Sequence, residues 1–149
     1  MTDITPHISP HAPDTVAAML ERDAFSRWLG IDLVAARPGH CTLRMHVRAD
    51  MMNGFGVSHG GVAYSLADSA MAFACNAGTH VTVAVDNQMT YPAAVHENDE
   101  LIATADEEAA PGRLGFYRAT VRNQHGTVVA LFRGTVYRTG RPHSPSSGP

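Results

Sequence analysis

The chain has 149 residues, 44% of them hydrophobic and 17% charged, a composition that predicts one globular domain and excludes a largely disordered protein. The formal net charge is −3 and the basic residues form no cluster, which argues against a nucleic acid as partner. The first 14 residues contain three prolines and no apolar run, and there are only two cysteines. We therefore expect no signal peptide and a cytoplasmic protein with reduced thiols.

The N-terminal part is predicted to contain one helix. Residues 1–13 are expected to be a flexible segment, because their prolines prevent a stable helix. A helix is predicted over residues 15–28, with Asp14 as its N-cap and Gly30 as the residue that ends it. A single domain is expected to span residues 14–139.

Two strands are predicted next. Residues 31–36 form the first, and a turn at Pro38 and Gly39 follows it. Residues 41–48 alternate between apolar and polar side chains, which is typical of an antiparallel strand with one buried face.

A nearly continuous apolar run predicts a buried helix from Gly60 to Cys75. Ser58 is placed to cap its first turn, and Gly60 and Gly61 let another group approach the amides there. The helix is too short, and too interrupted by polar residues, to span a membrane. Asp68 lies in its middle, either as a structural acid that is hydrogen-bonded nearby or as a general base or nucleophile tuned by burial.

Four strand patterns complete the predicted domain, and in the first of them valines and polar or small residues alternate. The order of helices and strands predicts an α+β domain, with one antiparallel sheet of about six strands around a central helix. Residues 140–149 are expected to be a flexible tail. The four strands cover residues 81–91, 100–106, 114–122 and 128–137.

The spacing of Gly60 and Asp68 predicts a homodimer. Asp68 follows Gly60 by eight residues, which corresponds to about 12 Å along a helix axis. One helix therefore cannot bring both groups to the same substrate atom. A site that uses both must combine two copies of the helix across a dimer interface.

The run from Asn53 to Asp68, N-G-F-G-V-S-H-G-G-V-A-Y-S-L-A-D, is similar to the motif of hotdog-fold acyl-CoA thioesterases. It looks closest to the phenylacetate-degradation (PaaI-type) branch, and the resemblance extends from about Leu29 to Arg138. It implies a hotdog fold and hydrolysis of an aryl-acetyl-CoA thioester, such as phenylacetyl-CoA or hydroxyphenylacetyl-CoA, to the free acid and CoA. It also implies no cofactor or metal, and a homotetramer built from dimers with shared active sites.

The resemblance assigns roles to individual residues. The Gly60 amide would polarise the thioester carbonyl, and Asp68 of the partner subunit would activate water or attack the carbonyl itself. Asn53 matches the residue that orients water or the carbonyl. His59 has two interpretations, a contact with the thioester or a structural lock of the loop onto the helix.

Substrate contacts are predicted at both ends of the ligand. Phe55 and Val57 are expected to line the acyl pocket, with Gly61 beside the helix start, and Arg113 is a candidate for the CoA phosphates. Two alternatives stay open: a CoA-ester-binding module without catalysis, and a hotdog enoyl-CoA hydratase, which would use a catalytic His paired with an acid in a different motif.

Overall fold

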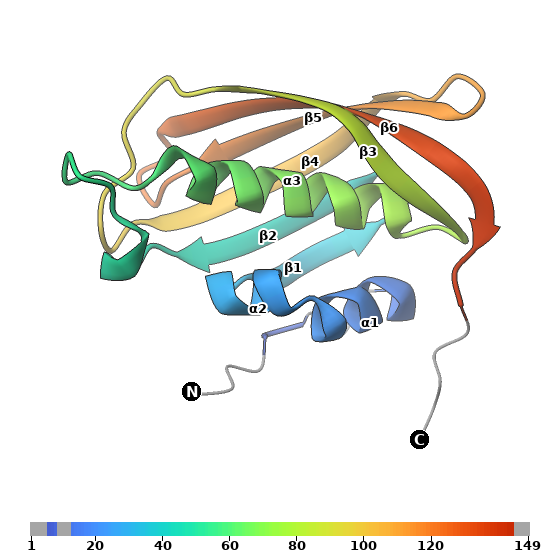
Figure 1. Ribbon diagram of the computed structural model, residues 1–149, viewed down its shortest axis with the longest axis horizontal. Helices are drawn as coiled ribbons and strands as arrows, with labels where there is room; N and C mark the ends of the chain where they lie inside the picture. The colour runs from blue at the N-terminus through green and yellow to red at the C-terminus, as the bar shows by residue number, and fades with distance from the viewer. Residues whose placement is uncertain (1–5, 9–12, 145–149) are drawn as a thin grey trace.

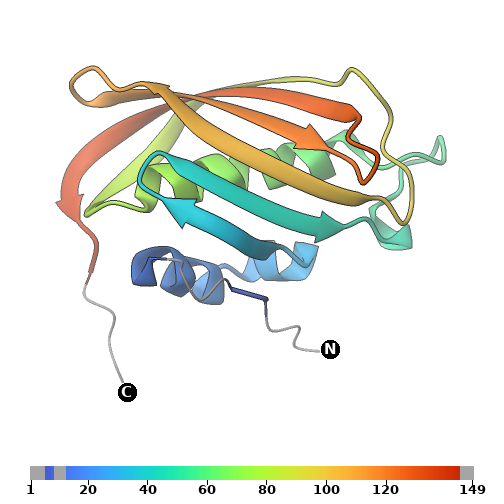
Figure 2. The same cartoon turned by 180° about the vertical axis from the view of Figure 1, so that it is seen from behind.

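The computed structural model describes residues 6–8 and 13–144, in which six strands form one antiparallel sheet in the order β1-β2-β4-β5-β6-β3. The helix α3 (Gly60–Asn76) crosses one face of this sheet, and no helix of the described residues lies on the other face (Figures 1 and 2). This arrangement confirms the predicted α+β hotdog fold. The strands are β1 (Asp32–Arg37), β2 (His40–His46), β3 (His80–Thr90), β4 (Glu100–Ala109), β5 (Leu114–Arg122) and β6 (Val128–Pro142).

The central helix is buried because its apolar residues meet the inward side chains of the strands. Leu66, Ala67, Ala70 and Met71 are fully buried in the core that α3 shares with the sheet. The turn between β1 and β2 is fastened to the helix, since the Gly39 amide donates to the Ala74 carbonyl at 3.0 Å. Among the described helices, none is both long enough and apolar enough to span a membrane.

The predicted N-terminal helix is two helices, α1 (Asp14–Arg22) and α2 (Ala24–Leu29), which pack beside the sheet (Figure 1). Asp23 separates them because its carboxylate accepts hydrogen bonds from the Ser26 amide and hydroxyl, at 3.0 and 2.6 Å, and so caps α2. The predicted cap at Asp14 is wrong, since Asp14 is the first helical residue and Pro13 holds the cap position. Gly30 ends α2 with φ 75°, as predicted.

Described elements of the structure reach beyond both ends of the predicted domain, residues 14–139. In the segment expected to be flexible, residues 6–8 lie against β1, where the Leu33 amide donates to the His7 carbonyl at 2.8 Å. At the other end β6 continues to Pro142, so the boundary predicted at residue 139 falls inside a strand. The remaining parts of the two predicted segments, residues 1–5, 9–12 and 145–149, lie outside the described residues.

The strand β3 is an edge of the sheet and is paired only with β6 among the described strands. Its register shifts between Ala84 and Asp86, which marks a β-bulge. Val83 before the bulge and Val85 within it are 43% and 59% exposed, whereas Thr82 is buried. The simple alternation predicted for this strand therefore does not continue through it.

The start of β3 is fixed to the end of α3 by one side chain. The buried Asn76 donates from Nδ2 to the Thr82 carbonyl and accepts from the Thr82 amide at Oδ1, both at 2.9 Å. The two hydrogen bonds give both Nδ2 and Oδ1 of Asn76 a partner, and they fix the position of β3 relative to α3.

We expect Gly134→Ala to lower the free energy of unfolding by about 1–3 kcal/mol, as overpacking of a filled core does. A β-carbon at Gly134 on β6 would overlap the buried Met71 sulfur and would lie 3.0 Å from Asn87 Oδ1. Urea denaturation measures the change. Gly78→Ala is the control, because a β-carbon there has no atom within 4 Å; equal stability of both variants would contradict the packing argument.

Candidate active site

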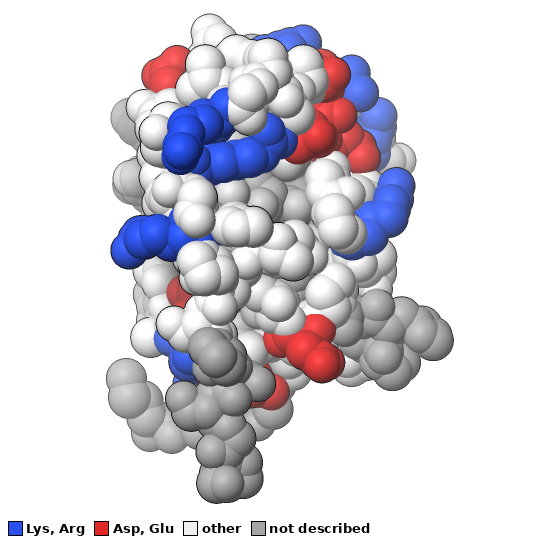
Figure 3. Space-filling view, turned by 90° about the vertical axis from the view of Figure 1, so that its right-hand side faces the viewer, with Lys and Arg blue, Asp and Glu red and all other residues white. Residues whose placement is uncertain are grey.

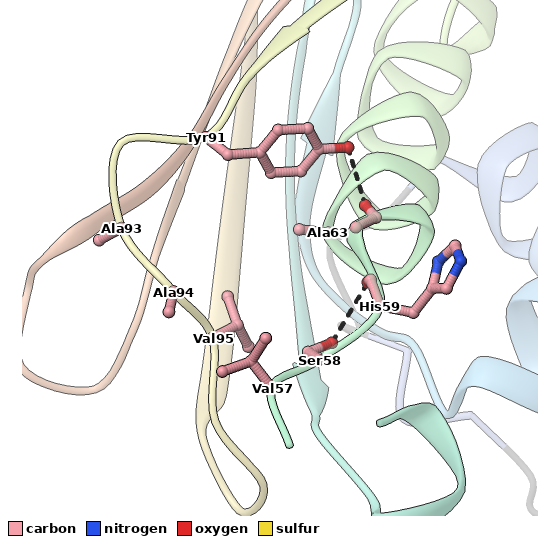
Figure 4. Close-up of a pocket in the computed structure, with 9 residues that line it drawn as sticks. Val57, Ser58, His59, Ala63, Tyr91, Ala93, Ala94 and Val95 are labelled. Atoms are coloured by element: carbon pink, nitrogen blue, oxygen red, sulfur yellow. Dashed lines mark hydrogen bonds between the residues drawn. The ribbon is translucent and has the colours of Figure 1, made fainter. Parts of the chain in front are cut away.

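His59 forms the cap of α3. Its Nδ1 accepts from the Gly61 amide at 2.9 Å, and its ring points away from the pocket at the helix start (Figure 4). This contact fits the structural interpretation of His59, a lock of the loop onto the helix, and it engages the Gly61 amide in the cap. The predicted cap at Ser58 is wrong, because its hydroxyl instead donates to the His59 carbonyl at 3.4 Å.

The Gly60 amide is available for a ligand. Within residues 6–8 and 13–144, no hydrogen-bond acceptor contacts its N–H. The Gly60 carbonyl accepts from the Tyr91 hydroxyl at 2.9 Å, and this hydroxyl lies 3.3 Å from where a β-carbon would stand (Figure 4). A free amide at the positive end of a helix dipole is a site for an oxygen that gains negative charge.

Asn53 organises the loop before the helix. Its Oδ1 accepts from the Phe55 amide at 2.8 Å and from the Val57 amide at 3.4 Å, and its own backbone amide donates to the Val57 carbonyl at 2.8 Å. The Nδ2 group of Asn53 has no acceptor in the described parts of the chain, so it can still donate to water or to a ligand.

A cavity of about 270 Å³ lies between the start of α3 and the segment that follows β3 (Figure 4). Val57 lines it, whereas Phe55 is 93% exposed at the loop tip and lines no wall of it. Tyr91 forms one side. Most of the other walls are small or apolar: Ala63, Ala93, Ala94 and Val95.

Asp68 lies half-buried on the side of α3 that faces β3. Burial raises the pKa of its carboxyl above the ordinary value, and a hydrogen bond from Asn87 Nδ2 to Oδ1, at 3.0 Å, opposes that rise. The other oxygen, Oδ2, has no partner among the described residues. A carboxylate with a raised pKa and one unengaged oxygen suits a general base or nucleophile.

Asn87 and Tyr91 are the residues that sequence reasoning missed. Asn87 also donates to the Tyr64 hydroxyl at 3.0 Å, and its Oδ1 is buried with no partner in the described structure. Leaving such an acceptor unpaired costs about 1–3 kcal/mol. A polar residue that points inward, on the strand after a helix with one carboxylate, would have been a signal for Asn87. The bulge breaks the alternation of the strand, so the sequence does not show which of its residues point inward.

The site residues do not all meet within one chain. Five of the predicted residues lie around the start of α3: Asn53, Val57, His59, Gly60 and Gly61. Asp68 lies two turns further along the same helix. Arg113 lies between β4 and β5, and the turn that joins these strands is at the end of the sheet opposite to the start of α3 (Figure 1). It donates to the Arg138 carbonyl at 3.3 Å, and that face carries arginines and acidic residues side by side (Figure 3).

The two cysteines are poor nucleophiles. Burial raises the pKa of both Cys41 and Cys75 to about 12, so both stay protonated at neutral pH. The described part of the chain has no group of His, Cys, Asp and Glu side chains arranged to hold a metal ion.

Comparison with known proteins identifies the family. Residues 55–130 match the thioesterase superfamily. The acyl-coenzyme A thioesterase PaaI of Escherichia coli K12 is 38% identical over 123 residues, covering 83% of this chain and 88% of that protein. Human acyl-coenzyme A thioesterase 13 is 31% identical over 126 residues, which are 82% of this chain and 90% of that protein.

Comparison with solved structures leads to the same family. The structure of E. coli PaaI, a protein of the phenylacetic acid degradation operon, superposes with a TM-score of 0.84 at 36% identity, covering 87% of this chain and 94% of that one. A mutant of the PaaI protein from Thermus thermophilus gives a TM-score of 0.74 at 38% identity, over 78% and 99% of the two chains. The chain therefore belongs to the thioesterase superfamily and is a thioester hydrolase of the hotdog fold.

Proposed function

We propose that the protein hydrolyses aryl-acetyl-CoA thioesters to the free acid and CoA. The observation that carries the proposal is the pair of reactive groups on α3: the unpaired Gly60 amide at its start and the half-buried Asp68 carboxylate in its middle. The family and the relatives named acyl-coenzyme A thioesterases support the reaction. The aryl-acetyl group rests on the similarity to the PaaI proteins and on the cavity beside Gly60.

In the proposed reaction, the thioester oxygen accepts a hydrogen bond from the Gly60 amide, and the helix dipole stabilises the charge that develops on it. Asp68 takes a proton from the attacking water, or attacks the carbonyl carbon and is then released by water. The carbon–sulfur bond breaks, and the CoA sulfur leaves and gains a proton. Both routes need the ionised form of Asp68, and Asn53 is placed to orient the water or the carbonyl.

The proposed assembly is a homodimer in which Gly60 of one chain works with Asp68 of the partner subunit. Eight residues of helix hold the two groups about 12 Å apart in one chain. The edge strand β3 offers a route to assembly, because an exposed edge with outward valines is a template for pairing with a second copy. A homotetramer of two such dimers is the larger assembly that we propose.

The acyl pocket in this proposal is the cavity at the helix start. Its volume of about 270 Å³ is slightly below the roughly 300–1,000 Å³ of small-molecule sites, which favours a compact acyl group over a long chain. For the CoA phosphates, Arg113 is exposed and keeps its guanidinium near the surface. No cofactor beyond the CoA part of the substrate is included.

We expect the wild type to release thiol fastest from phenylacetyl-CoA or hydroxyphenylacetyl-CoA in a panel of acetyl-, hexanoyl-, palmitoyl- and aryl-acetyl-CoA. Asp68→Asn should lower kcat/KM by about 10²–10⁴-fold, because it removes the base or nucleophile and keeps the shape of the side chain. Binding of the esters by the wild type without thiol release would favour a binding module. Hydration of an enoyl-CoA in the same assay would favour the hydratase.

The same Asp68→Asn variant should be at least as stable as the wild type at pH 7. The folded-state pKa of Asp68 is raised by burial, so folding disfavours its ionised form. This penalty is absent below the unfolded pKa and grows as the pH rises through the raised folded pKa. A lower midpoint of thermal unfolding for the variant at pH 7 would contradict this, and it would show that the carboxylate has a stabilising role.

The role of the Gly60 amide is tested by Gly60→Pro against Gly60→Ala. Both add a β-carbon near Tyr91, but only proline removes the N–H. Proline is well accepted at the first helical position, and His59 has φ −57° and ψ 135°, which suits a residue before proline. We expect kcat of the proline variant to be about 10²–10³-fold below that of the alanine variant. Equal rates would exclude the amide as the oxyanion donor.

A shared active site predicts complementation between inactive chains. When Asp68→Asn and Gly60→Pro chains are co-expressed with different tags, half of the dimers are mixed and each mixed dimer has one intact site of two. Thiol release should recover to about a quarter of the wild-type rate. If dimers purified through both tags contain both chains and are still inactive, the whole site lies within one chain.

A further inference from the structure

Asn87 links the edge strand to the reactive helix. From β3, its Nδ2 group donates to Asp68 Oδ1 and to the Tyr64 hydroxyl, each at 3.0 Å. Asp68 and Tyr64 lie one helical turn apart on α3, so the amide bridges two successive turns of the helix. Among the described residues, no other side chain donates a hydrogen bond to Asp68.

The orientation of the Asn87 amide is fixed by its surroundings. Both Nδ2 hydrogens are used, and a flipped amide would place its carbonyl oxygen against the carboxylate. Tyr64 is held in turn by the ring of Phe132, whose centroid lies 5.8 Å away in an edge-to-face arrangement. Gly134, opposite Asn87 on β6, leaves the space for the amide, since a β-carbon there would lie 3.0 Å from Oδ1.

We propose that Asn87 is a positioning residue for thioester hydrolysis, which holds Oδ1 of Asp68 in place and leaves Oδ2 as the oxygen that acts on water or on the thioester carbonyl. This inference rests on the proposed function. It specifies which carboxylate oxygen reacts and which strand controls it. Because Asn87 lies on β3, the geometry of the carboxylate depends on the edge strand as well as on the helix that bears it.

Packing alone does not account for an asparagine at this position. Its Oδ1 is buried and has no partner in the described structure, so the amide leaves a polar atom that an apolar side chain would not leave. The hydroxyl groups of Ser69 and Thr82 make other hydrogen bonds and do not bond to Asp68. The Ser69 hydroxyl lies 3.2 Å from that of Ser26, and the Thr82 hydroxyl donates to the His80 carbonyl at 3.4 Å.

The contact also affects the charge of Asp68. Burial raises the pKa of this carboxyl, and the hydrogen bond from Asn87 acts in the opposite direction. Loss of the donor therefore raises the pKa further. Since the ionised carboxylate is the active form, activity on the acid side must move to higher pH.

The test compares the pH profile of kcat/KM for wild type, Asn87→Leu and the control Gln88→Ala. Leucine removes the donor and fills a similar volume, whereas Gln88 is exposed on the same strand. A hydrogen bond to a charged group corresponds to about one to two pH units, so the acid limb of Asn87→Leu should move up by about that amount. Its rate on the alkaline plateau should fall less than its rate at acid pH, and Gln88→Ala should retain the wild-type profile.

A uniform loss of rate at every pH, with the acid limb unmoved, would overturn the proposal and leave Asn87 a structural role. If Asn87→Leu does not fold, Asn87→Asp keeps the shape of the side chain and replaces the donor by a second carboxylate. The acid limb should then also move to higher pH, because the two carboxylates repel. An unmoved limb in this variant is equally contrary to the proposal.

The titration of Asp68 can also be followed without turnover. In protein labelled with ¹³C at aspartate carboxyl carbons, the Asp68 signal is identified by its loss in Asp68→Asn, and its midpoint should be higher in Asn87→Leu than in wild type. A wild type that releases no thiol from any ester would contradict the proposed function. The carboxyl titration would still decide whether Asn87 acts on Asp68, and equal midpoints would refute that.

Discussion

The rigid spacing of Gly60 and Asp68 along α3 is the constraint on which the rest of the structure depends. A helix fixes the two groups about 12 Å apart, so the amide and the carboxylate of one chain cannot act on the same thioester carbonyl. The sheet wraps around the helix and excludes water from most of it. The carboxylate must then emerge on the side where the wrapping ends, which is the side of the edge strand β3.

The carboxylate is tolerated within this buried helix because its surroundings are polar on one side. The Asn87 amide reaches it from β3, while Asn76 fastens the start of that strand to the helix end. Two asparagines thus connect the same pair of elements, one buried with its bonds satisfied and one with an unpaired oxygen. The first has the features of a structural residue, and the second those of a residue retained for chemistry.

Sequence patterns predicted the parts of the fold that local physics decides. The all-apolar run indicated the position of α3, and Gly30 ended α2 because only the left-handed conformation closes that helix. Asp23 was missed as a helix break because a strong capping residue outweighed the apolar periodicity around it. His59 was missed as a cap because histidine is not among the usual capping residues.

The residues of the candidate site are divided in the same way, into those within a local motif and those brought in by the fold. Gly60, Asp68 and Asn53 stand out in the sequence because they lie within one short motif. Asn87 and Tyr91 reach the site through contacts of β3 and the segment after it with α3, 19 and 31 residues away from their partners in the chain. Such contacts depend on strand register, and a bulge changes that register without leaving a pattern that can be read from the residues.

The bulge in β3 lets the strand carry one extra residue without moving the residues that follow it. Paired residues of neighbouring strands point to the same face, and Ala84 and Asp86 pair with the consecutive residues Val136 and Thr135 of β6. Val85 is therefore the extra residue, and Asn87 stays opposite Gly134 whether or not Val85 is present. In a relative without the extra residue, an alignment has to place a one-residue gap at this position to match the residue that faces the helix.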